Sequence, residues 1–178
     1  WADDTRTLTY RECEAAVTER AADFTDMQGQ GVNIQAADPY VQWRDWLAAQ
    51  AAGAVPVLFH ATLSAEDTAA LCRTHGIDGA ADVPRPQGAD FGILSSGSTG
   101  LPKLFWRRSP SWITFFPIQN PLFALGGDSR LFFHGSLSFT GNLNACASVF
   151  WDGGALITTA RKRPDAWWQV IRRHRVNA

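Results

Sequence analysis

The residues best suited to chemistry lie between positions 95 and 103, where hydroxyl side chains, glycines and a lysine follow one another. Small residues let a backbone curl until several N–H groups point at one position, which creates a concave anion site. Hydroxyl groups add donors, and the lysine adds a mobile positive charge suited to phosphate. The segment therefore predicts a polyphosphate site, and a simple hairpin turn is the alternative interpretation. The predicted site residues are Ser95, Ser96, Gly97, Ser98, Thr99, Gly100 and Lys103.

Two well-known phosphate-binding patterns do not fit this segment. A Walker A loop requires a lysine directly after its second glycine, whereas Lys103 lies three residues beyond Gly100. The dinucleotide fingerprint G-x-G-x-x-G fails as well, because the segment contains no G-x-G. A third pattern, (S/T)-(S/T)-G-(S/T)-(S/T)-G-x-P-K, fits residues 95–103 at every position.

The elements that would position this segment alternate between strands and helices. We expect strands at 31–36, 54–59, 130–134 and 155–158, and helices at 9–26, 38–53, 64–76, 140–151 and 164–175. The apolar run at 54–59 is typical of a strand that is covered on both faces. Strands and helices in this order predict parallel βαβ units. The expected fold is therefore α/β, with a mainly parallel sheet flanked by helices on both faces and a hairpin that carries the phosphate-binding loop.

Local patterns give several of these helices a start and a buried face. Thr9 and Glu12 have the spacing of a capping box. Three sets of residues at helical spacing are expected to be buried. They are Tyr10, Cys13, Val17, Ala21 and Phe24; Val41, Trp43, Trp46, Leu47 and Ala51; and Trp167, Trp168 and Ile171.

Composition excludes several classes of protein. The 178 residues are 46% hydrophobic, which is typical of a folded globule rather than of a disordered chain. A net charge of -1 gives no general reason to expect a nucleic-acid or membrane partner. The longest apolar runs are far shorter than the ~20 residues that span a bilayer, and no signal peptide is evident. The three cysteines have no C-x-x-C spacing, so we expect no zinc site, no disulfide framework and a cytoplasmic location.

On the nine-position pattern, the chain resembles the adenylate-forming superfamily: acyl-CoA synthetases, aryl-acid ligases, peptide-synthetase adenylation domains and luciferases. Further segments are similar to family motifs in the same order along nearly the whole chain. They are 9–12 (the "TYxEL" helix start), 31–34 (the "GDxVAI" strand), 51–57 ("AGAVxVPL"), 136–141 ("PLFHxxG") and 151–155 ("LxxGA").

The resemblance implies an activity in two halves. A carboxylate attacks the α-phosphate of Mg·ATP to give an acyl-adenylate and pyrophosphate, and a thiol of coenzyme A or of a carrier-protein phosphopantetheine then takes the acyl group. It implies that Ser95–Gly100 hold the β- and γ-phosphates and that Lys103 assists until pyrophosphate leaves. Phe139 and Gly141 would line the acyl pocket. The partners it implies are a small carboxylic acid and, in the carrier-loading branch, an acyl or peptidyl carrier protein.

The sequence departs from the family pattern at several positions. Gln30 replaces an aspartate, Leu104 a glycine, and Phe139 the histidine of "PLFH". The motifs for adenine and ribose, the magnesium-binding glutamate and the lysine of the small C-terminal domain are not found in these 178 residues. Because the chain opens on Trp1 and stops at Ala178, both ends look cut. We therefore expect residues 1–178 to be a partial N-terminal large domain, inactive alone, with the magnesium ligand elsewhere.

Three functional readings stay open at this point: a ligase that uses coenzyme A, an adenylation domain that loads a carrier protein, and a non-catalytic nucleotide-binding or interaction fragment. His60 and His75 have no partner pattern and are expected on the surface or in loops, and His134 in a core or pocket wall. Phe139 fits a pocket wall and ordinary core equally well. The basic residues at 161–163, 172, 173 and 175 are expected to form a solvated helix face, since no spacing supports a coenzyme A or carrier contact.

Overall fold

The structure of the protein is a computed structural model in which residues 1–95 and 102–178 are described. The chain divides into two compact units. Unit 1 comprises Trp1–Cys13, Pro110–Gly135 and Gly141–Ala178, and unit 2 comprises Glu14–Ser109 and Ser136–Thr140. Among the described residues, none of the helices is both long and apolar enough to cross a membrane.

Unit 2 is built on a four-stranded sheet with the order β1-β2-β3-β4. The strands are β1 (Gly31–Gln35), β2 (Val55–Phe59), β3 (Phe91–Ser95) and β4 (Lys103–Arg107). The first three strands are parallel, and β4 returns antiparallel to β3 as a hairpin. This arrangement confirms the expected mainly parallel sheet with a hairpin at its edge.

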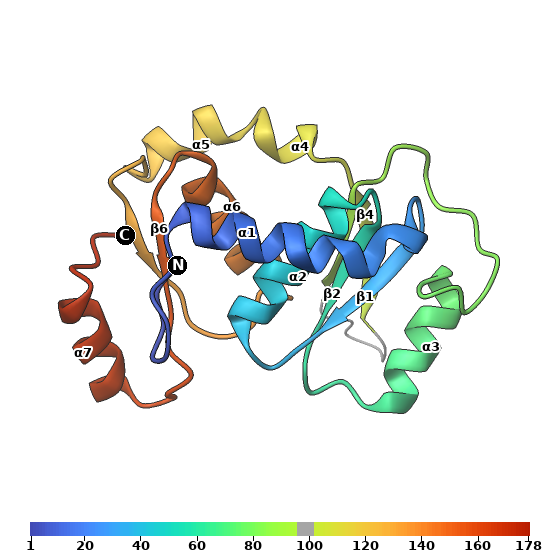
Figure 1. Ribbon diagram of the computed structural model, residues 1–178, viewed down its shortest axis with the longest axis horizontal. Helices are drawn as coiled ribbons and strands as arrows, with labels where there is room; N and C mark the ends of the chain where they lie inside the picture. The colour runs from blue at the N-terminus through green and yellow to red at the C-terminus, as the bar shows by residue number, and fades with distance from the viewer. Residues whose placement is uncertain (96–101) are drawn as a thin grey trace. The chain divides into compact units, whose positions relative to one another are not determined.

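The two faces of this sheet are covered by different helices (Figure 1). Helix α3 (Ala65–His75) packs on the face that carries Val57 and Phe59. Helix α2 (Pro39–Ala51) packs on the opposite face, where its Trp46 contacts Phe91 edge-on at 5.6 Å between ring centroids. Because side chains alternate along a strand, β2 is buried at every position between the two helices.

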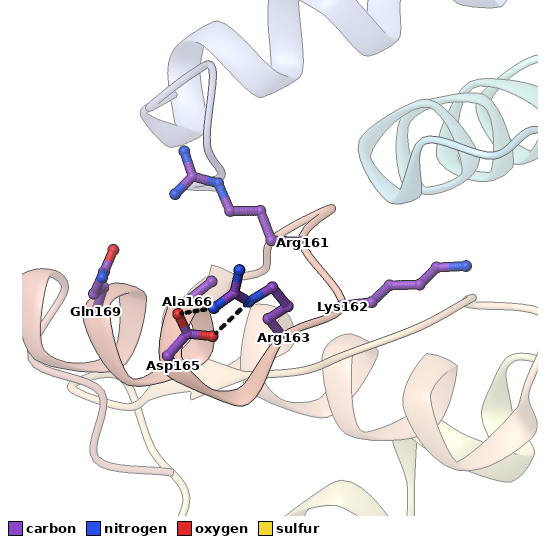
Figure 2. Close-up of a pocket in the computed structure, with 6 residues that line it drawn as sticks. All are labelled: Arg161, Lys162, Arg163, Asp165, Ala166 and Gln169. Atoms are coloured by element: carbon purple, nitrogen blue, oxygen red, sulfur yellow. Dashed lines mark hydrogen bonds and ion pairs between the residues drawn. The ribbon is translucent and has the colours of Figure 1, made fainter.

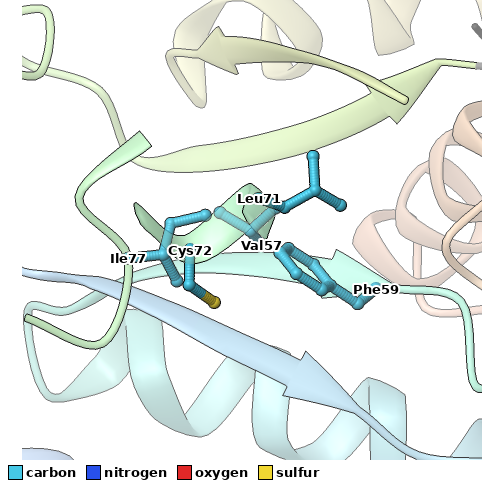
Figure 3. Close-up of a cluster of buried hydrophobic side chains, with 5 residues drawn as sticks. All are labelled: Val57, Phe59, Leu71, Cys72 and Ile77. Carbon is cyan, nitrogen blue, oxygen red and sulfur yellow. The ribbon is translucent and has the colours of Figure 1, made fainter. Parts of the chain in front are cut away.

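The core on the α3 face is a cluster of Val57, Phe59, Leu71, Cys72 and Ile77 (Figure 3). The half-buried residues of the hairpin, Leu104 and Trp106, pack against it. Apolar burial of this kind stabilises a fold by about 25 cal/mol per Å² of surface removed from water. The hairpin is therefore fixed to the core through one face of β4.

The helix boundaries follow the capping signals. Thr9 and Glu12 form the expected capping box before α1 (Tyr10–Ala21), with the Thr9 N–H donating to Glu12 Oε2 at 2.8 Å. A 3₁₀ helix, η1 (Ala22–Met27), follows α1. Asp38 accepts from the Tyr40 N–H at the start of α2, and Ser64 accepts from the Asp67 N–H at the start of α3. These local bonds confirm the predicted helix starts.

Unit 1 contains a two-stranded parallel sheet of β5 (Arg130–Phe132) and β6 (Ala155–Ile157). The helices are α4 (Pro110–Ile113), α5 (Phe116–Leu122), α6 (Thr140–Trp151) and α7 (Pro164–Arg173), of which α6 has its first residue in unit 2. The Tyr10 hydroxyl donates to the Gly154 carbonyl at 2.7 Å, which connects the start of α1 to the start of β6.

All three predicted buried faces were partly wrong. In α2, Val41 and Leu47 are only half-buried and Ala51 is exposed, while Gln42 and Asp45 are buried. Asp45 is paired with Arg20 and Arg44, so burial of its carboxylate is compensated. Periodicity of apolar residues cannot reveal a helix that is covered on most of its circumference.

In α7, Trp168 is 61% exposed rather than buried, and Ala166 faces inward instead. Trp167 and Ile171 are half-buried. In the first helix, Tyr10 is 44% exposed, whereas the predicted burial of Cys13 and Phe24 is confirmed.

Candidate functional site

The β3–β4 hairpin brings the two described ends of the predicted phosphate loop together. Ser95 is the last residue of β3 and Lys103 the first of β4, and the antiparallel register pairs them directly. Opposed residues of such a pair share a face, with Cβ atoms about 4.5–5.5 Å apart. The other five predicted site residues, Ser96, Gly97, Ser98, Thr99 and Gly100, lie outside the described residues. Their roles stay predictions.

Lys103 belongs to the exposed face of β4. Along β4, exposed positions alternate with half-buried ones, and Lys103, Phe105 and Arg107 are the exposed residues. The register places Ser95, which is half-buried, on the same side of the hairpin, since Ser95 is opposite Lys103. A hydroxyl and an ammonium group therefore lie next to each other at the end of the hairpin, where both suit an anion.

Three parallel strands end at the same edge of this sheet. Gln35 is the last residue of β1, His60 follows β2 directly, and Ser95 is the last residue of β3. In open α/β sheets, ligands bind beyond the carboxyl ends of the strands. The predicted phosphate loop begins at this edge, so we take the edge as the candidate functional site.

The main chain at this edge is held by a side-chain network on Gln35. Its Nε2 donates to the carbonyls of His60 and Leu63, both at 3.2 Å, and its Oε1 accepts from the Thr68 hydroxyl at 3.2 Å. Each of the two amide atoms is thus engaged with the β2–α3 connection or with α3. The turn that carries His60 is consequently fixed at its backbone.

The His60 ring is also fixed. Its Nδ1 accepts from the Thr62 N–H at 3.3 Å and lies 2.6 Å from the Thr62 hydroxyl. The ring meets Phe139 in a T-shaped contact, with centroids 5.7 Å apart. His60 lies in the loop after β2, as expected, and its partners Thr62 and Phe139 are ones that no sequence pattern indicated.

Phe139 lies on the segment Ser136–Thr140, which belongs to unit 2 although the chain on either side belongs to unit 1. Gln42 of α2, 1% exposed, attaches this segment to the sheet. Gln42 Oε1 accepts from the Leu137 N–H at 3.0 Å and from the Ser136 hydroxyl at 3.2 Å. Gln42 Nε2 donates to the carbonyl of Phe59, the last residue of β2, at 3.4 Å.

Of the two predicted acyl-pocket residues, Phe139 is therefore beside the sheet edge. It is 58% exposed, which excludes the alternative that it is ordinary core. Gly141 is the second residue of α6 and belongs to unit 1, and a Cβ built on it would meet no other atom within 4 Å. His134 also belongs to unit 1, where it is exposed and contacts Trp167 with ring centroids 4.4 Å apart.

The role of Gln42 was not predicted from the sequence. Helix α2 also contains Arg44, Asp45 and a second glutamine, Gln50, and a polar residue in a helix is more often solvent-facing. The importance of Gln42 comes from tertiary hydrogen bonds to Leu137 and Phe59, which no spacing rule reveals.

Two hollows in the described part of the molecule lie at α7 and the residues just before it. One, of about 420 Å³, is lined by Asp165, Trp168, Gln169 and Arg172. The other, of about 370 Å³, is lined by Arg161, Lys162, Arg163, Asp165, Ala166 and Gln169 (Figure 2). In this second hollow, Arg161 and Lys162 extend in different directions, while Arg163 turns back to Asp165 at 3.0 Å. The arginines and lysine at 161–163, 172, 173 and 175 are exposed, as predicted, but of these six residues just 172 and 173 lie within α7, so they do not form one helix face.

Residues 1–95 and 102–178 contain no group of three or more His, Cys, Asp or Glu side chains that could hold a metal ion. The side chains described at the sheet edge are instead hydroxyls, amides, an imidazole and the Lys103 ammonium. These groups suit a phosphate or carboxylate ligand rather than a cation.

Comparison with known proteins places this fold among adenylate-forming enzymes. It matches o-succinylbenzoate CoA synthetase (MenE) from Bacillus subtilis in complex with the acyl-adenylate intermediate OSB-AMP, with TM-score 0.81, 16% identity and coverage of 98% of this chain and 55% of that one. It matches the nonribosomal peptide synthetase FmoA3 with TM-score 0.80, 17% identity and coverage of 99% and 23%. It matches the N-terminal domain of FACL13 from Mycobacterium tuberculosis with TM-score 0.81 and 17% identity, and the match covers 95% of this chain and 54% of that one.

No family model and no curated protein matches the sequence. At these identities the structural matches establish the fold, and they confirm at that level the resemblance inferred from the motifs. The chain spans about half the length of the MenE and FACL13 chains.

Proposed function

We propose that the chain is the N-terminal portion of an adenylate-forming ligase, which uses ATP to activate a carboxylic acid and then transfers the acyl group to a thiol. One observation carries the proposal. Ser95 and Lys103 are paired at the carboxyl edge of a parallel sheet, in a fold that matches enzymes of this kind. The sequence between them fits the phosphate-loop pattern of those enzymes at every position.

The proposed first half-reaction forms a bond between a carboxylate oxygen and the α-phosphorus of ATP. The bond from that phosphorus to the bridging oxygen breaks, and pyrophosphate leaves with the electron pair. Little covalent work falls to the protein, so catalysis depends on position and on neutralisation of phosphate charge. Lys103 supplies a cation at the hairpin, and Ser95–Gly100 supply hydroxyl and N–H donors for the β- and γ-phosphates.

The proposed acyl pocket includes Phe139, whose exposed ring stands beside His60 at the sheet edge. Gly141 is proposed as an acyl-pocket residue on the resemblance of residues 136–141 to the family motif alone. The acid is a small carboxylic acid, and the acceptor is coenzyme A or the phosphopantetheine of a carrier protein. Magnesium would accompany ATP, but the described residues offer no cluster to hold it, so its ligand is proposed to lie outside this part of the chain.

ATP–pyrophosphate exchange on the full-length protein tests the proposal. We expect exchange that depends on an added carboxylate, when aryl, fatty and amino acids are compared as separate panels. Transfer to coenzyme A or to a phosphopantetheinylated carrier protein then identifies the acceptor. Binding of ATP without exchange on any acid would overturn the proposal and favour a non-catalytic nucleotide-binding protein.

A further inference from the structure

We propose that Gln42 is a positioning residue for the acid-binding site and that His60 forms, with Phe139, the wall that selects the acyl group. This inference rests on the proposed function and adds two residues to it. Neither residue belongs to a motif that the sequence analysis assigned to chemistry.

The side-chain amide of Gln42 is buried. A buried amide that lacked partners would be costly, and this one is 1% exposed with both of its polar atoms engaged. Its partners lie on two separate pieces of chain, the end of β2 and the segment Ser136–Thr140. The amide therefore connects the strand that leads into His60 with the segment that carries Phe139.

The His60 and Phe139 rings are held in different ways. His60 is fixed at its carbonyl by Gln35 and at its ring by Thr62, so it cannot follow Phe139 if that residue moves. Phe139 is exposed, and the only ring contact recorded for it among the described residues is with His60. Its position consequently depends on its backbone, which Gln42 holds at Leu137 and Ser136.

These contacts act together. The buried Gln42 amide holds the segment Ser136–Thr140 in place, this segment positions the Phe139 ring, and the fixed His60 ring packs against it. Aromatic pairs prefer edge-to-face packing, which gives the wall a defined shape. A wall of this kind distinguishes acyl groups by shape. It should affect how tightly an acid binds more than how ATP binds.

The first test measures position without activity. In Gln42→Met, which keeps the side-chain length but removes the amide, the Leu137 N–H loses its acceptor. We expect amide hydrogen exchange in residues 136–140 of the full-length protein to rise by roughly tenfold or more. The matched control is Gln50→Met on the same helix, because Gln50 Nε2 donates only to the Trp46 carbonyl one turn away. If residues 136–140 were equally protected from hydrogen exchange in the two variants, the positioning role of Gln42 would be overturned.

Ser136→Ala provides a second variant if Gln42→Met does not fold. It removes one of the two bonds that Gln42 accepts and leaves the Leu137 bond in place. It also removes the acceptor of the Ser138 N–H, so exchange at Ser138 is set aside and residues 136, 137, 139 and 140 are compared. We expect a smaller rise in exchange over these residues. No change in them with Ser136→Ala, alongside an unfolded Gln42→Met, would assign Gln42 to general stability and overturn the proposal.

The second test uses carboxylate-dependent exchange and compares KM with kcat. Gln42→Met and His60→Ala are expected to raise KM for the preferred acid by roughly tenfold and to alter the ranking among acids, with KM for ATP unchanged. Gln50→Met should behave as the parent does. If the parent is active and both variants keep its KM for the acid and its ranking among acids, the selectivity role is overturned. If the parent shows no exchange with any acid, the proposed function fails, while the hydrogen-exchange result still decides whether Gln42 positions the segment.

Discussion

The chain contains two lysines, one in each unit, and their surroundings differ. Lys103 begins β4, with its backbone in a sheet and its neighbour Ser95 fixed by register. Lys162 lies in the irregular stretch before α7, between two arginines, and extends away from both (Figure 2). Both are exposed, so exposure does not distinguish them.

This difference shows that a high density of charged residues does not by itself indicate a binding site in this molecule. Residues 161–175 contain six arginines and lysines and one acidic residue, and several of them line two hollows. Their side chains are spread over α7 and the residues on either side of it, and Arg163 is paired with its neighbour Asp165. At the sheet edge there is less charge, but Gln35 and Gln42 hold the backbone in place. Preorganised groups of that kind are what recognition requires.

The strongest way to break this comparison is to remove each lysine in turn. Lys103→Ala is expected to slow carboxylate-dependent adenylation by about 10²–10³-fold, because one stabilising group for phosphate charge is lost. Its fold should be unchanged, since Lys103 is exposed. Lys162→Ala is the control and should keep the parental rate within about twofold, as a surface substitution outside the site. Steady-state exchange kinetics measure both, and equal rates in the two variants would remove the distinction between the two regions.

The next largest effect concerns the close packing beneath the hairpin. A Cβ on Gly92 would lie 2.7 Å from Val57 Cγ2 and 2.8 Å from Leu104 Cδ1. Gly92→Ala should therefore lower the free energy of unfolding by about 1–3 kcal/mol through overpacking. Gly141→Ala, where the new methyl meets no atom within 4 Å in helix α6, should be neutral or stabilising by up to about 1 kcal/mol. Urea unfolding of both variants checks the contrast, and a neutral Gly92→Ala would show that the hairpin is not packed as described.

A pH-dependent effect arises in the core behind the same hairpin. Burial, with the nearby Asp78 carboxylate, raises the pKa of the Cys72 thiol to about 11, compared with about 8.5 for an unperturbed cysteine. The folded state thus holds this proton more tightly than the unfolded state does. The contribution of Cys72 to stability is full below about pH 8.5 and is lost as the pH rises toward 11.

Unfolding measured at pH 8 and at pH 10.5 tests this sign. The stability advantage of the parent over Cys72→Ala should shrink at the higher pH. An advantage that stays constant or grows would contradict the raised pKa.

The smallest effect is expected on α7. Arg163 and Asp165 form a two-pronged pair, but their side chains are 82% and 58% exposed. Such pairs contribute little, so Arg163→Ala should change stability by less than about 1 kcal/mol. Thermal unfolding at low and at high salt measures it. A larger, salt-sensitive loss would mean that the basic region of α7 is more organised than the sheet edge.

Much of the fold could be predicted because local signals and global packing agree. The Thr9–Glu12 capping box, the Asp38 and Ser64 caps and the apolar run of β2 all lead to the observed elements. Errors occurred where tertiary contacts override periodicity. Trp168 has the spacing of a buried residue, yet its side of α7 faces solvent.

The candidate site also has one part that could be predicted from the sequence and one part that could not. The nine-position pattern identified the hairpin, since its glycines, hydroxyls and lysine are contiguous in sequence. The Gln42 bonds to residues 136 and 137 connect positions more than ninety residues apart, which no local pattern encodes. The contact between His60 and Phe139 was hidden for the same reason.

The most direct test of the central claim, that the hairpin binds the polyphosphate of ATP, is the rate at which the two lysines are chemically acetylated in the full-length protein. Mass spectrometry resolves the two sites, so each molecule carries its own control. With inorganic pyrophosphate added, acetylation of Lys103 should slow several-fold while that of Lys162 stays unchanged. Slowing of both lysines alike, or of neither, would contradict the account.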